Sequence, residues 1–354
     1  MNPNQYVQAG KYVNSCLIGA NVYCINSAEE EFHSAVVEEI TDAIRQEKGR
    51  SYMRANTLLD ESELWMVPFH IGKDKLRKLQ QTMEYIFQQT LGLRGFHFPL
   101  DIVLEDGQTA YLMHPIDRQK TTPIRTFMPD AFAPRWKIAA SLFQRVLKLK
   151  QLGLTSNGIS REQLRVQKET GEVQLWLNET VAFVQGSEYP ENTLRHKGFM
   201  ALPIATEKAC SKLGIGINGT QRDIFSAAVA AFYLILYTHP FIGSGFHGLL
   251  REDYLTNYQH FPMYVMLDDP QNNLGNQMFG RVVEGQWKRT VPQLRELFDG
   301  LFKAVTNPAE HWKQNAPYWE PQNWLNALAL DAQANDNEAS WSDFHFRNEQ
   351  YHQV

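Results

Sequence analysis

The stretch Thr220-Gln221-Arg222-Asp223-Ile224-Phe225-Ser226-Ala227-Ala228-Val229 carries the clearest information about the fold. It opens an apolar run from Ile224 to Tyr237 that only Ser226 interrupts. A helix that is apolar on every side is buried in the centre of a domain or spans a membrane. This run is shorter than the ~20 residues that a membrane span requires. We therefore predict a buried central helix in a soluble protein.

The amino-acid composition of the chain excludes several classes of function. Hydrophobic residues make up 43% of the 354 residues, and the net charge is 34 − 39 = −5. Nucleic-acid-binding proteins carry a basic patch, and no dense Lys/Arg run occurs, so we expect no nucleic-acid partner. Three scattered cysteines, Cys16, Cys24 and Cys210, fit neither a disulfide framework nor a zinc site. With no signal-peptide pattern at the start, a cytoplasmic location is expected.

The first 113 residues read as a small mixed lobe. Phe32, Val36, Ile40 and Ile44 recur every fourth residue, which predicts an amphipathic helix. A second helix is predicted from Lys73 to Leu91. Strand patterns occupy Tyr12–Ile25, Tyr52–Leu59, Leu64–Phe69, Leu100–Leu104 and Thr109–Met113.

The remainder of the chain is mostly helical in pattern. A helix should start near Pro134 and end at Gly153, and a strand hairpin should join 164–166 to 173–175. Leu294, Leu297, Phe298 and Leu301 mark one face of a later helix. The predicted fold class is α+β, with an N-terminal extension (1–45), a small lobe (46–113), a helical lobe (114–330) and a polar tail (331–354). A hinge is expected near 113–118.

This order of elements resembles a protein kinase domain, and most closely a group of bacterial Ser/Thr-kinase-like proteins. Besides the segment 220–229, the stretches that carry the resemblance are Phe98–Leu104, Tyr111–Met113, His239–Gly243 and Trp324–Leu328. The resemblance implies a bilobal fold with a small β-rich N-lobe and a mostly helical C-lobe. It also implies that Asp223, at the start of the central helix, holds the backbone of the catalytic loop.

Phosphoryl transfer needs an aspartate for the substrate hydroxyl, and an asparagine and an aspartate for Mg²⁺. The frame of the segment Gly153–Val166 resembles the kinase catalytic loop, G-x-x-H-x-D-x-x-x-x-N-x-x-V. On that pattern Ser156 replaces the histidine, Gly158 the catalytic aspartate and Gln163 the metal-binding asparagine. Glycine has no side chain that could accept a proton.

The other kinase positions are also changed. The metal-binding aspartate of D-F-G falls on Leu177, and a shift of one or two residues would offer Asn178 or Glu179. Gln163, Asn178 and Glu179 are therefore the candidate cofactor-binding residues. The phosphate-binding lysine falls near Val67, and no glycine-rich loop precedes it.

Three further sets of residues are candidates for structural, binding or metal-ligand roles. Glu207, in Ala205-Thr206-Glu207, resembles the glutamate that closes the kinase activation segment, but the expected arginine ahead of Trp324 is missing. Glu207 should have either another partner or an exposed position. Tyr254, Tyr258, Phe261 and Tyr264 are the predicted partner surface, because aromatic residues are enriched in interfaces. The histidines at 239, 247, 260 and 311 lack metal-ligand spacing, so no metal site is expected.

These observations predict a catalytically inactive pseudokinase that acts as a scaffold or allosteric partner in bacterial phospho-signalling, with neither ATP nor Mg²⁺ as a cofactor. By the resemblance, a PP2C-type phosphatase or a von Willebrand A-domain protein is the expected partner. Two alternatives remain open: an atypical ATP-dependent transferase or divergent Ser/Thr kinase, in which Glu162 would join the candidate residues, and a purely structural subunit of a larger assembly.

Overall fold

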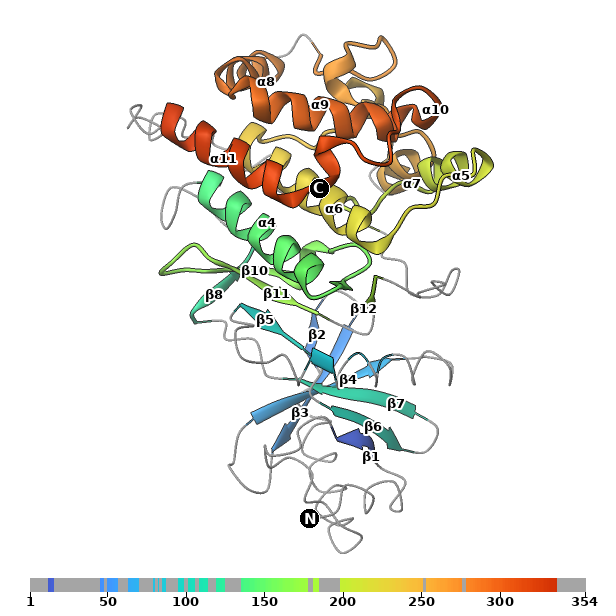
Figure 1. The fold of residues 1–354 in the computed structure, drawn as a ribbon, viewed down its shortest axis with the longest axis vertical. Helices are drawn as coiled ribbons and strands as arrows, with labels where there is room; N and C mark the ends of the chain where they lie inside the picture. Colours follow the sequence, from blue (N-terminus) through green and yellow to red (C-terminus); the bar gives the residue numbers. More distant parts are fainter. Residues whose placement is uncertain are drawn as a thin grey trace, which may run out of the picture. The chain divides into compact units, whose positions relative to one another are not determined.

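The structure, a computed structural model, describes residues 12–15, 45–47, 50–56, 63–69, 79, 82, 85–86, 95–98, 101–105, 108–113, 119–124, 135–177, 181–184, 198–250, 253–275 and 278–335. The chain forms two compact units (Figure 1). Unit 1 contains residues 1–121 and 174–194, and unit 2 contains residues 122–173 and 195–354.

Unit 1 contains a six-stranded antiparallel sheet in the order β1-β6-β7-β4-β3-β2. Its strands are β1 (Tyr12–Ser15), β2 (Arg45–Glu47), β3 (Arg50–Asn56), β4 (Glu63–Phe69), β6 (Asp101–Glu105) and β7 (Gln108–Met113). The four strands β3, β4, β6 and β7 lie where the sequence pattern predicts them. Val67 lies in β4, opposite Tyr111 of β7.

A second part of unit 1 is built around a short parallel pair. β5 (Phe96–His97) pairs with β11 (Val173–Trp176), so that Trp176 lies opposite His97. The rings of these two residues are stacked at 3.8 Å, and His97 Nε2 is 3.1 Å from Gln174 Oε1. β12 (Ala182–Phe183) follows, and the Phe183 ring contacts Tyr85 edge-on.

Two of the predicted helices lie largely or wholly outside the residues that the structure describes. Of the predicted helix 73–91, the structure describes Leu79, Thr82, Tyr85 and Ile86, which are helical, and Leu79 and Ile86 are buried. The predicted helix through Phe32 to Ile44 lies outside the described residues.

Unit 2 is mostly helical. Its helices are α4 (Arg135–Gln151), α5 (Ile204–Lys212), α6 (Gly219–Leu236), α7 (Asp253–His260), α8 (Met278–Arg289), α9 (Pro292–Thr306), α10 (Pro308–His311) and α11 (Pro321–Asn335). Short elements are β8 (Thr121–Pro123), at the boundary of the units, β9 (Leu154–Thr155), η4 (Arg161–Gln163), β10 (Leu164–Gln167), η5 (Ser244–Phe246), η6 (Val265–Leu267) and η7 (Pro317–Trp319). The mixed α+β content agrees with the predicted fold class. The bilobal arrangement stays a prediction.

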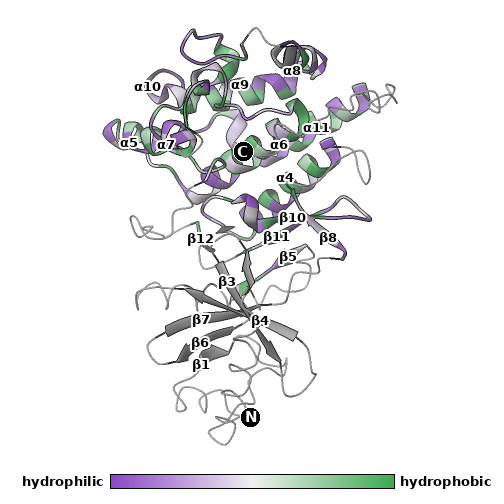
Figure 2. Ribbon diagram, turned by 180° about the vertical axis from the view of Figure 1, so that it is seen from behind, coloured by the Kyte–Doolittle hydropathy of each residue, from purple (hydrophilic) through white to green (hydrophobic). Residues whose placement is uncertain are grey.

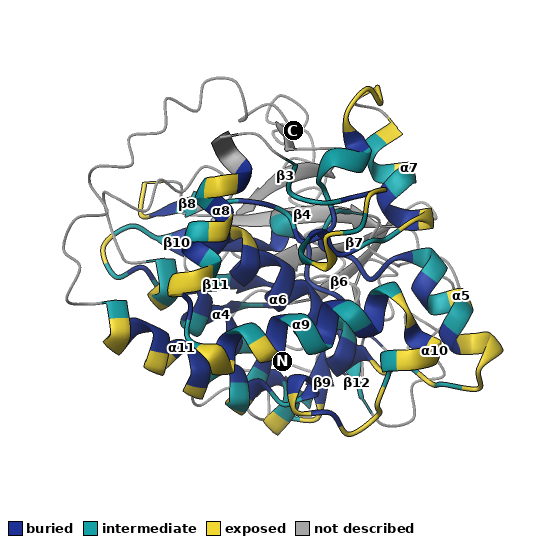
Figure 3. Ribbon diagram, turned by 90° about the horizontal axis from the view of Figure 1, so that it is seen from above, coloured by how far each residue is buried: buried dark blue, intermediate teal, exposed yellow. Residues whose placement is uncertain are grey.

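Helix α6 is the centre of unit 2, as its apolar sequence predicts. Every residue of α6 except Arg222 and Tyr233 is buried, and Figure 3 shows the helix dark blue along most of its length. α4 and α9 pack against α6, and α11 packs against α4 and α9. Trp324 of α11 is completely buried, and its ring stacks on Phe143 of α4 at 4.9 Å.

The outer helices are amphipathic. In Figure 2 the ribbon of α9 alternates between hydrophobic and hydrophilic colours. Leu294, Phe298 and Leu301 face the core without exposed surface, as their spacing predicts. None of the helices in the described part of the chain has the length and apolar character needed to cross a bilayer.

The segments before and after α7 are joined to each other by a close backbone contact. The side chain of Asn272 accepts a hydrogen bond from Gly245 N and donates to the carbonyl groups of Phe241 and Met263. Ser244 N donates to Asn273 O at 2.7 Å. A Cβ atom at Gly243 would overlap Asn273 O, and one at Gly245 would overlap Gln271 O. Both positions therefore require glycine.

The C-terminal boundary differs from the expected one. α11 continues to Asn335, whereas the polar tail is predicted from residue 331. Asp331 is buried, and its Oδ1 accepts a hydrogen bond from Val291 N, next to the start of α9. This contact extends the ordered helix beyond Leu330, although the local sequence is polar.

Candidate functional site

The candidate site is the loop of unit 2 that runs from β9 to η4, together with the first turns of α6. Asn218 caps α6: its side chain accepts a hydrogen bond from Gln221 N, and the Gln221 side chain accepts one from Asn218 N. This capping box starts the helix at Gly219 and so places Asp223 in its second turn. Asp223 is 1% exposed.

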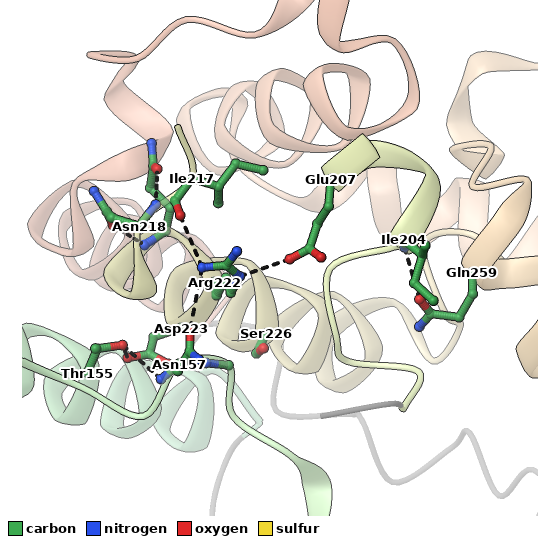
Figure 4. A network of polar contacts seen from close by, with 12 residues as sticks. Thr155, Asn157, Ile204, Glu207, Ile217, Asn218, Arg222, Asp223, Ser226 and Gln259 are labelled. Carbon is green, nitrogen blue, oxygen red and sulfur yellow. Dashed lines mark hydrogen bonds and ion pairs between the residues drawn. The ribbon is translucent and has the colours of Figure 1, made fainter. Parts of the chain in front are cut away.

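The carboxylate of Asp223 accepts three hydrogen bonds from the loop (Figure 4). Oδ2 accepts from Ser156 N at 2.9 Å and from Thr155 Oγ1 at 2.7 Å. Oδ1 accepts from Gly158 N at 2.7 Å. Two of the three donors are backbone N–H groups, so the carboxylate fixes the path of the loop. This is the contact that the kinase resemblance implies for Asp223.

Burial is the largest influence on the pKa of this group. It raises the pKa of Asp223 from its ordinary 3.8 to about 6, while the hydrogen bonds from Thr155, Gly158 and Ser156 and the charge of Arg222 act in the opposite direction. Because this pKa lies below 7, the ionised form predominates near neutral pH, and it is the form that accepts all three hydrogen bonds.

Arg222, the residue before Asp223, joins three parts of unit 2. Its Nε is 2.9 Å from Glu207 Oε1 of α5, and both side chains are mostly buried. Its Nη1 donates to Ile217 O at 3.0 Å and to Asn157 Oδ1 at 3.4 Å (Figure 4). Glu207 is therefore neither exposed nor unpaired. Its partner lies on α6 rather than near the C-terminal tryptophan.

Ser226, one turn after Arg222, completes the anchoring of the loop. Its hydroxyl accepts a hydrogen bond from Ile159 N at 3.1 Å and donates one to Met200 O at 2.9 Å. The only polar residue within the apolar run of α6 thus links the loop to the segment before α5.

The loop backbone is unusual at the two positions before Ile159. Asn157 has φ +59° and Gly158 has φ +101°. A Cβ atom at Gly158 would find room, because its nearest neighbours would be 3.9 Å away, but the backbone angle disfavours any L-residue. The position assigned to the catalytic aspartate is thus shaped for glycine.

Gln163, one of the candidate cofactor-binding residues, is buried and bonded within the loop. Its Oε1 accepts a hydrogen bond from Ser160 N at 2.8 Å, and its Nε2 donates to Ser156 Oγ at 3.1 Å. The amide oxygen that could have bound a metal ion therefore already accepts a backbone N–H group.

The position assigned to the metal-binding aspartate lies in unit 1. Leu177 has no exposed surface, and its N–H donates to His97 O at 2.8 Å. Asn178 and Glu179, the other two candidates, lie outside the described residues, and so does the Val67 side chain. Across the residues that the structure describes, no group of three or more His, Cys, Asp or Glu side chains could hold a metal ion.

The predicted partner surface is wrong for two of its four residues. Tyr258 and Tyr264 have no exposed surface. Tyr258 Oη donates to Ala201 O at 2.6 Å, and the Tyr264 ring packs on Phe302 at 5.2 Å. Aromatic content alone does not separate interface from core. Phe261 is 72% exposed, and Tyr254 is half-buried against Phe246.

His239 is a structural residue with both ring nitrogens engaged. Its Nε2 is 2.6 Å from Phe199 O, and its Nδ1 accepts a hydrogen bond from Phe241 N. Burial lowers its pKa from 6.5 to about 4, against the effect of the Phe199 carbonyl. The ring is therefore neutral at pH 7.

Sequence reasoning placed Asp223 but missed Arg222, Thr155 and Ser226. Arg222 and Ser226 flank Asp223 at −1 and +3 on the same helix, and an i, i+4 pair shares one face. A search for polar residues near Asp223 on the helix would have found both. Thr155 gives no comparable signal.

No protein-family model and no curated protein matches the chain. Among solved structures, it is similar to the crystal structure of a rhoptry kinase from Toxoplasma gondii, with 13% sequence identity and a TM-score of 0.42. The match covers 81% of this chain and 79% of that one. A similarity at this level supports no inference about activity.

Proposed function

We propose that this chain is a kinase-like protein that does not transfer phosphate and acts by binding another protein. The observation that carries the proposal is the contact between Asp223 and the backbone of the loop at Ser156 and Gly158. The carboxylate holds the loop as the kinase resemblance requires, while the loop itself presents glycine where the catalytic aspartate would stand.

Three features of the described residues support inactivity. Gly158 combines a missing side chain with a left-handed backbone angle. The oxygen of Gln163 is bonded to Ser160 N. Leu177 offers an apolar, buried side chain at the position of the metal ligand, and a hard divalent cation needs oxygen ligands.

The partner follows from the sequence resemblance alone. Bacterial kinase-like proteins of this type are associated with PP2C-type phosphatases and von Willebrand A-domain proteins, so a phospho-signalling protein of one of these kinds is the proposed partner. Phe261, with most of its ring exposed, is the residue of the predicted partner surface that stays available for such a contact.

Nucleotide binding gives the first test. Thermal unfolding of the full chain is measured with ATP, alone and with Mg²⁺, beside an active kinase as a positive control. A ligand at a concentration equal to its Kd stabilises by only about 0.4 kcal/mol, so a Kd near 1 mM or weaker gives almost no shift at 1 mM ATP. A strong Mg²⁺-dependent shift would contradict the proposal.

Incubation with labelled ATP separates the proposal from an atypical transferase. We expect neither γ-phosphate nor adenylate to be incorporated into protein. If label is incorporated, the variants Glu179→Gln and Glu162→Gln identify whether an alternative carboxylate is responsible. Loss of the label in either variant would establish the transferase in place of the pseudokinase.

A further inference from the structure

Helices α9 and α11 form the walls of a groove on unit 2, with a volume of about 780 Å³. Ligand pockets typically have about 300–1,000 Å³, so the groove is large enough for several side chains. Its lining includes Leu297 and Gly300 of α9, Ala327 and Leu330 of α11, and Tyr318 of η7, whose ring lies directly over Gly300. The two helices pack directly on each other and are neighbours in Figure 1.

The groove has an apolar floor and a charged rim. Leu297, Tyr318 and Ala327 are buried at its base. The rim carries charges of both signs, from Glu296, Lys303, Glu310 and Lys313. Such a lining suits a peptide that combines aromatic residues with both an acidic and a basic side chain.

The chain itself supplies a segment of this composition beside the groove. Leu330 lines the groove, and α11 ends at Asn335. The sequence then continues through Trp341-Ser342-Asp343-Phe344-His345-Phe346-Arg347, which lies outside the described residues. It contains three aromatic residues together with one acid, Asp343, and one arginine, Arg347.

The lengths allow this segment to reach along the whole α11 wall of the groove. The residues between Asn335 and Trp341 can span up to about 20 Å when extended. The groove-lining part of α11, from Asn323 to Leu330, is only about 10 Å long. Because the segment is tethered to one wall of the groove, its effective concentration there is in the millimolar range, which favours its own chain over a second copy.

We propose that residues 341–347 bind in the groove between α9 and α11 of the same chain. The aromatic side chains cover the apolar floor at Leu297 and Ala327. Asp343 pairs with the lysines of the rim, and Arg347 pairs with its glutamates. Leu330, 44% exposed, then becomes a contact residue at the mouth of the groove.

Photo-cross-linking in the full chain tests the proposal. A benzoylphenylalanine replaces Phe344, and the cross-linked peptides of the monomer are identified by mass spectrometry. Cross-links to residues 293–330 within one chain are expected. Cross-links elsewhere on the molecule, no cross-links, or cross-links confined to a dimer would overturn the proposal.

Two further substitutions control for the groove itself. Leu330→Glu places a charge at its mouth and should reduce the cross-link yield several-fold. Leu213→Glu, at a residue 49% exposed and outside the groove, should leave the yield unchanged. Both residues are exposed, and equal thermal unfolding temperatures show that the two variants fold. Equal yields from both variants would also overturn the proposal.

Discussion

The loop from Leu154 to Gln163 and the end of strand β11 at Leu177 differ in what holds them in place. The loop rests on a buried carboxylate that accepts three hydrogen bonds. The strand end rests on apolar burial, the pairing with β5 and the stacked rings of His97 and Trp176.

This difference shows where a buried charge is retained. Burial of an ionised carboxylate is costly unless hydrogen-bond donors surround it. Asp223 has those donors because the loop backbone turns toward it, and Leu177 has an apolar environment instead. A buried acid is therefore present where backbone donors surround it, and the buried position after β11 carries an apolar side chain instead.

The largest expected effect comes from removing the acceptor. In the Asp223→Ala variant, the N–H groups of Ser156 and Gly158 and the hydroxyl of Thr155 lose their hydrogen-bond acceptor. Hydrogen bonds to charged groups contribute about 1.5–3 kcal/mol each, so the loss in free energy of unfolding should be about 4 kcal/mol or more. Urea denaturation measures the loss, and hydrogen exchange should show faster exchange at both amides.

The matched control is Asp253→Ala, at an exposed aspartate in the first turn of α7. It should cost less than about 1 kcal/mol. If the Asp223 variant costs no more than this control, the loop is held by something other than the carboxylate, and the contrast with the strand end disappears.

The pH dependence of stability sharpens the contrast further. Asp223 binds its proton more tightly in the folded state, since its pKa rises from 3.8 to about 6. This tighter proton binding adds to the free energy of unfolding in full below pH 4, and the added stability is lost as the pH rises through 6. The advantage of the wild type over Asp223→Asn should shrink by roughly 2–3 kcal/mol between pH 4 and pH 7.

His239 provides a control of opposite sign. Its pKa falls from 6.5 to about 4 in the folded state, so its contribution is present above pH 6.5 and is lost as the pH falls through 4. The advantage of the wild type over His239→Gln should therefore grow between pH 4.5 and pH 7. Urea denaturation at each pH measures both series, and a common sign would refute the assignment.

A smaller effect is expected for the pair between Glu207 and Arg222. A double-mutant cycle with Glu207→Gln and Arg222→Met should give a coupling of about 1–3 kcal/mol, because both side chains are mostly buried. The pair of Asp299 and Lys303, at i, i+4 spacing on α9, has side chains that are more than a third exposed and should give about 0.5 kcal/mol or less. Equal couplings would mean that burial of the pair is unimportant.

The smallest effect concerns the backbone at Gly158. Gly158→Ala should cost about 1 kcal/mol through its φ of +101°, since the added methyl group meets no atom closer than 3.9 Å. Gly216→Ala, where nothing lies within 4 Å and φ is not positive, should be neutral or stabilising. Gly158→Asp should cost at least as much as the alanine variant and should not produce phosphate transfer from labelled ATP.

The sequence predicted those elements whose signal is local. β3, β4, β6, β7, α4 and α6 follow from hydrophobic patterns within each segment. Asp223 could be placed because the kinase resemblance implies an aspartate at the start of the apolar central helix. The partner of Glu207 could not, because the pairing depends on how α5 packs beside α6, which periodicity does not encode. Tyr258 and Tyr264 were misassigned for the same reason.

The close contact of Gly243 and Gly245 with residues 271–273 has a consequence for variation in the two connections on either side of α7. Long surface connections usually accept substitutions and insertions readily. Here two positions admit no side chain, and Asn272 supplies three hydrogen bonds that no other residue can reproduce together. A scan of all amino acids should therefore find Gly243, Gly245 and Asn272 as intolerant as the central helix, and a graft of this segment into another protein would have to carry all three.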